Sequence, residues 1–159
     1  MTKSRTITQE PGEPSVRYEA DGLRVELAAD HEVLIPVAPP AEQEKQALLR
    51  QLAERPRWAA ALAEHGADGI AKLLPASPAP WPFIEAAAVA PGAPDSVRCA
   101  CGDPGCAWRA PALAAARAAW AADAELRLRR LGWMREALLA AVWAAWAAEA
   151  PLADAEAAL

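Results

Sequence analysis

The chain has 159 residues, a formal net charge of −5 and 54% hydrophobic residues, many of them alanine. This length allows one domain with a buried core. The acidic balance argues against a protein that coats nucleic acid by bulk electrostatics, which needs an excess of lysine and arginine. No uncharged run is longer than the 12 residues of Ala137–Ala148; as a helix of about 18 Å this run cannot cross a hydrocarbon core of about 30 Å. Met1–Val16 is polar, so we expect no secretory signal, no membrane association and a cytoplasmic protein.

The first part of the chain is predicted to form a small antiparallel β element. Residues 1–15 lack periodicity and are typical of a disordered tail. Val16–Tyr18 and Leu23–Leu27 alternate apolar with polar residues around Asp21-Gly22, which predicts a β-hairpin. Val33–Val37 predicts a third strand, at an edge of the sheet because it contains a proline.

Helical spacing of apolar residues dominates the remainder. The predicted helices span residues 41–54, 56–65, a short stretch around 70–74, 106–122 and 131–149. A proline-rich connector, residues 75–98, ends in a short strand at Val97–Cys99. The predicted fold class is therefore α+β: a small N-terminal antiparallel β element followed by helices. Residues 16–90 form the hairpin and first helical segment, and residues 91–159 form the cysteine turn and C-terminal helices, in one compact unit with it.

The chain's three cysteines, Cys99, Cys101 and Cys106, fall within eight residues. A Cys-x-Cys pair directs two sulfurs to one side of a bend, and the Gly-Asp-Pro-Gly turn of residues 102–105 returns Cys106 to face them. Zinc takes four nitrogen or sulfur ligands in a tetrahedron, so the cluster predicts a zinc site that lacks one ligand. Idle thiols of a decayed site and redox chemistry are the alternatives. The odd cysteine count favours a reducing compartment in which thiols stay free.

The sequence leaves the fourth ligand open. His65 lies on the apolar face of the predicted helix 56–65, whereas His31 lies in the polar turn Asp30-His31-Glu32, where we expect it to face solvent. Asp103 lies inside the spacer, where such residues usually bond their own backbone. Water or a partner's side chain is the remaining choice.

This order of elements resembles the bacterial SWIM zinc-finger proteins, whose signature is Cys-x-Cys, a spacer, and Cys-x-His at the start of a helix. Cys99, Cys101 and Cys106 match the three cysteine positions, and Trp108 occupies the position of the family's histidine. Residues 123–139 are similar to the arginine- and leucine-rich segment that closes these proteins. The resemblance implies a structural zinc ion and a non-catalytic adaptor that contacts DNA or protein beside a Swi/Snf-type helicase.

Four arginines form the main basic concentration of the chain: Arg127, Arg129, Arg130 and Arg135. They are interpreted either as a solvated helix face or as a contact for phosphate or a partner.

The tryptophans from Trp108 to Trp146 could form a stacking surface for single-stranded nucleic acid, but their helical spacing favours a core. Trp143 and Trp146 are expected on one stripe with Leu139 and Val142, and Trp133, off that stripe, is the best candidate for exposure.

No catalytic constellation is present in the sequence. It has no glycine-rich phosphate loop and no Gly-x-Ser-x-Gly motif, and both histidines are distant from the cysteines. We therefore expect a protein that is not an enzyme and has no small-molecule substrate. The expected function is a zinc-finger-like adaptor for a protein partner in a larger assembly, and the alternative is a DNA-binding finger that uses the arginines of residues 127–135.

Overall fold

The computed structural model describes residues 13–28, 31–37, 40–74 and 97–149. Its contacts define two compact units: unit 1 comprises Met1–Val37 and Pro82–Arg117, and unit 2 comprises Ala38–Trp81 and Ala118–Leu159. The predicted domain boundary at residues 90–91 and most of the predicted tail and connector lie outside the described residues. The described part confirms the α+β class, with the β element first and helices after it.

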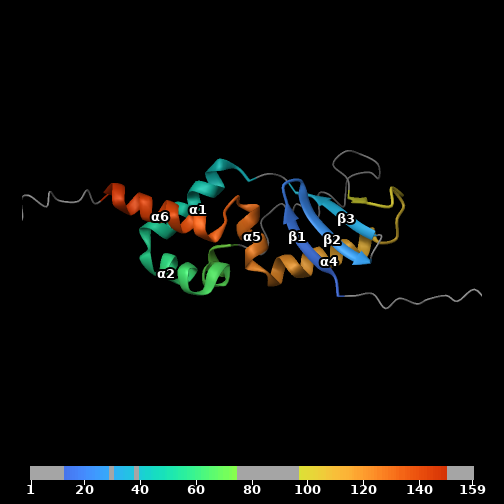
Figure 1. The fold of residues 1–159 in the computed structure, drawn as a ribbon, viewed down its shortest axis with the longest axis horizontal. Helices are drawn as coiled ribbons and strands as arrows, with labels where there is room; N and C mark the ends of the chain where they lie inside the picture. Colours follow the sequence, from blue (N-terminus) through green and yellow to red (C-terminus); the bar gives the residue numbers. More distant parts are fainter. Residues whose placement is uncertain (1–12, 29–30, 38–39, 75–96, 150–159) are drawn as a thin grey trace, which may run out of the picture. The chain divides into compact units, whose positions relative to one another are not determined.

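Unit 1 contains an antiparallel sheet of four strands in the order β1-β2-β3-β4 (Figure 1). The strands span Ser15–Glu19, Gly22–Ala28, His31–Pro36 and Arg98–Cys99. The predicted edge position of β3 is wrong, because β3 lies between β2 and β4; β4 pairs only with Val33 and Leu34, before Pro36. The predicted hairpin is confirmed, with Tyr18 opposite Leu23 across the turn. Gly22 is required there, because its φ is +145° and a Cβ would overlap the backbone oxygen of Ile35.

Strand alternation separates an apolar face of this sheet from a charged one. The apolar side chains that β2 and β3 bury are Leu23, Val25, Leu27, Val33 and Ile35. On the other face Arg24 bonds Glu32 at 2.8 Å and Asp21 at 2.9 Å, and Arg17 bonds Glu32 at 2.6 Å. The arginines lower the pKa of the Glu32 carboxyl. The sheet thus carries a network of ion pairs around Arg17 and Arg24.

The helix α4, Arg109–Ala122, follows the cysteine turn. Its most buried side chains are Ala112, Ala116 and Trp120, spaced four residues apart. This spacing confirms the helical period of the alanine-rich segment, although α4 begins three residues later than the predicted Cys106.

Unit 2 is helical. Its elements are α1 (Glu42–Glu54), α2 (Pro56–His65), the 3₁₀ helix η1 (Gly66–Leu73), α5 (Ala124–Arg130) and α6 (Arg135–Glu149). The helices α1, α2 and α6 contact one another, and η1 packs on α2 and α5 (Figure 1). Their shared core is made mainly of leucine: Leu48, Leu52, Leu62, Leu74, Leu128, Leu138 and Leu139, with Ile70 and Val142.

The sequence analysis missed α5 as a separate helix. Asp123 caps its start, since the Asp123 carboxylate accepts from the backbone N–H of Glu125 at 2.8 Å. Gly132, with a φ of +78°, follows its end. Both signals are visible in the sequence, and the helix that they bound lies between the predicted helices 106–122 and 131–149, in residues for which no helix was predicted.

The predicted exposure of the tryptophans is wrong at two positions. Trp133 is 8% exposed, and its Nε1–H donates to the backbone oxygen of Lys45 at 3.1 Å, because the reversal at Gly132 returns the chain toward α1. Trp143 is 56% exposed instead. It lies about 100° around the helix from Val142, outside the buried arc of α6.

Arg127 is buried, which corrects its assignment to a contact surface. Its Nε–H donates to the Leu74 oxygen at 2.8 Å, and Nη1 donates to the oxygens of Trp120 at 2.6 Å and Ala121 at 3.1 Å. Helix carbonyl ends carry partial negative charge, and the last turn of α4 and the end of η1 supply these oxygens. The guanidinium therefore ties together three segments of unit 2.

We expect Arg127→Ala to lower the free energy of unfolding by about 2–4 kcal/mol, because it leaves buried carbonyls without their charged donor. The measurement is urea unfolding of the full chain followed by circular dichroism. The matched control is Arg129→Ala, which removes an exposed pair with Glu125 one helical turn away and should cost about 0.5 kcal/mol or less. Equal losses in the two variants would contradict the role of Arg127.

Candidate metal centre

The ladder between β3 and β4 brings one histidine to the cysteines. Val33 is paired with Cys99, and the Ala100 N–H continues the ladder by donating to the Glu32 oxygen at 2.8 Å. Alternate residues of a strand share a face, so His31, two residues before Val33, lies on the same face as Cys99. The first residue of β3 and the last of β4 therefore direct side chains to one place.

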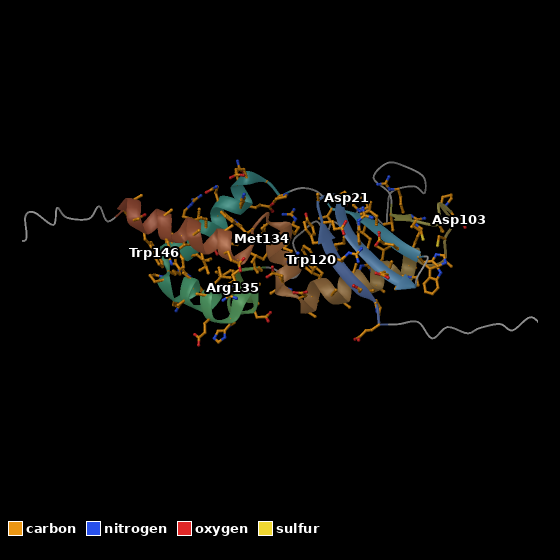
Figure 2. The ribbon with its side chains drawn as sticks, in the orientation of Figure 1. Asp21, Asp103, Trp120, Met134, Arg135 and Trp146 are labelled. Carbon is orange, nitrogen blue, oxygen red and sulfur yellow. The ribbon has the colours of Figure 1, made fainter. Side chains whose placement is uncertain are left out.

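The chain then turns to bring the other two thiols to that place. Gly102, with a φ of +79°, donates its N–H to the Cys99 oxygen at 3.0 Å. Asp103 accepts from the Gly105 N–H at 2.8 Å through its carboxylate and from the Cys106 N–H at 3.1 Å through its backbone oxygen. Figure 2 shows Asp103 on this turn. Its carboxylate bonds its own turn, as expected from sequence, and not the cluster.

Four ligand atoms converge as a result. One atom each from His31, Cys99, Cys101 and Cys106 lies within 4.8 Å of the other three, and together they could hold a metal ion. The Cys99 Sγ–His31 Nδ1 distance is 3.6 Å. Zinc bonds of about 2.3 Å to sulfur and about 2.0–2.1 Å to nitrogen at tetrahedral angles place neighbouring ligand atoms about 3.6–3.8 Å apart. The Cys99–His31 spacing therefore fits a tetrahedral site.

The structure brings His31, and not His65, next to the cysteines. His65, placed on an apolar face, is exposed at the end of α2 beside Glu64. His31, expected in a solvated turn, is half-buried and next to the cysteines. The sequence carries no signal for this choice, because it depends on which β3 residue is paired with Cys99.

Trp108 covers the imidazole of this site. The Trp108 and His31 rings stack with centroids 5.5 Å apart and an interplanar angle of 29°. The Trp108 backbone oxygen accepts from the Ala112 N–H at 3.0 Å and so begins the hydrogen-bonding of α4. An indole cannot ligate zinc, but this one packs directly against the residue that can. Trp108 occupies the position of the SWIM histidine in the sequence, and no local pattern predicts its contact with His31.

The thiols differ in their surroundings. Burial raises the pKa of Cys99 to about 11, whereas the Asp103 N–H, which bonds the Cys101 sulfur, lowers the pKa of Cys101. Cys99 is buried, Cys106 is partly exposed and Cys101 is exposed. At neutral pH the Cys99 thiol thus keeps its proton in the metal-free protein.

The other three predicted contact arginines all have partners within unit 2. Arg129 pairs with Glu125 at 3.2 Å, Arg130 pairs with Glu44 at 2.8 Å, and Arg135 donates to the Ala63 backbone oxygen. The Arg130 guanidinium lowers the pKa of Glu44. These contacts account for the arginine cluster by internal packing and ion pairs.

Comparisons with protein families, curated proteins and solved structures found no match. None of the helices in the described part of the chain combines the length and apolar character needed to cross a lipid bilayer. The resemblance to SWIM proteins therefore stays a prediction from the cysteine pattern.

We expect the apparent affinity for zinc to fall at least tenfold per unit as the pH is lowered from about 8 to about 6. Ligand thiols must lose their protons to bind the ion, and the raised pKa of Cys99 means that binding releases its proton throughout this range. Competition with a chromogenic chelator at a series of pH values measures the slope. A pH-independent affinity would contradict ligation by these thiols.

Proposed function

We propose that the chain is a zinc-binding adaptor whose metal ion is structural and whose partners are proteins. The observation that carries the proposal is the convergence of His31, Cys99, Cys101 and Cys106 within 4.8 Å. Three thiols and an imidazole are a typical ligand set for structural zinc, and soft sulfur ligands disfavour magnesium and calcium.

The complete ligand set supports a structural role. A catalytic zinc ion keeps one coordination position for water or substrate, whereas the four protein ligands available here would fill the tetrahedron. The β4 strand has two residues, and the turn after it is held by few backbone bonds. A bound ion fastens this turn to the start of β3 and contributes binding free energy to folding. This arrangement favours a protein that is not an enzyme.

Protein partners are favoured over DNA by the charges. The net charge is −5, Arg127 is buried, and Arg129, Arg130 and Arg135 have internal partners. The similarity of the cysteine turn to SWIM proteins suggests a larger assembly with a Swi/Snf-type helicase. Thiols that serve as ligands suit the reducing cytoplasm, which we propose as the location.

We expect the purified protein to hold one zinc ion per chain and His31→Ala to lose most of it. The matched control is His65→Ala, which removes the other histidine, exposed on α2, and should leave the zinc content unchanged. Elemental analysis after dialysis against a weak chelator gives the ratios. A ratio near zero in the unmutated protein would remove the metal centre from the proposal.

The double variant His31→Ala/Trp108→His tests the resemblance of the cysteine turn to SWIM proteins. The ring at position 108 lies 5.5 Å from the His31 ring, and a histidine there restores the Cys-x-His spacing of the family. We expect the double variant to regain the zinc that His31→Ala loses. Failure to regain zinc would count against descent from a SWIM-type site and leave the His31 site itself intact.

We expect no retardation of duplex DNA in a mobility-shift assay at either about 50 mM or about 200 mM salt. Binding through phosphates weakens steeply over this range, so a shift at the lower salt that disappears at the higher one would favour the DNA-binding alternative. If a shift occurs, Arg129→Glu tests the arginine cluster, because the Arg129 side chain is 45% exposed and that of Arg130 is 14% exposed.

A further inference from the structure

The proposed metal centre has a buried half and an exposed half. Cys99 is buried at the end of β4, and His31 is stacked under Trp108. Cys101 is exposed and Cys106 is partly exposed, both on the turn that contains Gly102 and Gly105. An oxidant arriving from solvent therefore meets two of the three sulfurs and not the third.

We propose that Cys101 and Cys106 form an oxidation site for hydroperoxides, and that a disulfide between them releases the metal ion. The inference rests on the proposed zinc site and assigns it a regulation. Their sulfurs lie within 4.8 Å of each other, and four residues that include two glycines separate them. Such a spacer lets the backbone adjust to a disulfide. Cys99 and Cys101 are separated by one residue, which rarely permits relaxed disulfide geometry.

The chemistry balances with the hydroperoxide as the sole oxidant. The Cys101 thiolate attacks the terminal peroxide oxygen, the O–O bond breaks, and the alcohol leaves after taking a proton, so that Cys101 becomes a sulfenic acid. The Cys106 thiolate then attacks the Cys101 sulfur and displaces hydroxide, which leaves as water with a second proton. Two thiolates have lost two electrons in total, and the peroxide has been reduced by two.

Formation of the Cys101–Cys106 disulfide removes two of the four proposed ligands from the metal ion. After oxidation the site retains Cys99 and His31, two of the four ligands that a tetrahedral ion needs. The turn is then no longer fastened to the start of β3. Thiol reductants reverse the disulfide, so oxidation and reduction switch the metal centre between loaded and released forms.

The experiment adds hydrogen peroxide to the zinc-loaded full chain in the presence of a chromogenic zinc chelator. We expect one zinc ion released per disulfide formed, a Cys101–Cys106 disulfide in the peptide map, and recovery of zinc binding after treatment with a phosphine reductant and added zinc. The chelator without peroxide is the control for spontaneous loss.

Other outcomes overturn the inference in distinguishable ways. Zinc retained at excess peroxide shows that the exposed thiolates are not an oxidation site. Release with irreversible sulfinic or sulfonic acids, or with a disulfide that includes Cys99, removes the proposed pair. A protein that binds no zinc before oxidant is added fails at the proposed function, and the regulation fails with it.

Discussion

The two-residue ladder between β3 and β4 is the interaction on which the metal centre depends. It sets Cys99 opposite Val33 and so puts His31 on the cysteine side of the sheet. A shift of one residue in this register would put the side chains of His31 and Cys99 on opposite faces of the sheet. Two residue pairs are a weak restraint by themselves, and a metal ion shared by both strands is a physical means of holding the register.

The four candidate ligands differ in burial and in the element that holds them. Cys99 and His31 belong to the sheet, and the Trp108 ring shields the imidazole. Cys101 and Cys106 belong to a turn that is open to solvent. The candidate centre thus combines a half held by the sheet with a half open to solvent. The proposed structural and redox roles are compatible in one site for this reason.

Unit 2 depends on a different kind of interaction, a buried cation held by backbone dipoles. Arg127 binds carbonyl oxygens at the end of α4 and after η1. Arg130 and Arg135 add contacts from the same stretch of chain to Glu44 and Ala63. Most arginines of this segment are thus engaged in contacts within unit 2.

Among the described residues, the large apolar side chains left exposed are Met134 and Trp143. In Figure 2 Met134 is labelled in unit 2, just before α6.

Local patterns in the sequence determined most of the secondary structure and three of the four candidate ligands. The hairpin at Asp21-Gly22, the helices after Pro40 and the convergence of Cys99, Cys101 and Cys106 follow from turn chemistry, apolar spacing and short loops, which act over a few residues. Asp123 and Gly132 are also local signals, for the start and the end of α5. Tertiary structure alone decided the choice of His31 over His65, the stacking of Trp108, and the burial of Arg127 and Trp133. Each of these depends on a contact between segments far apart in the chain, and no local propensity encodes which distant residue a side chain will meet.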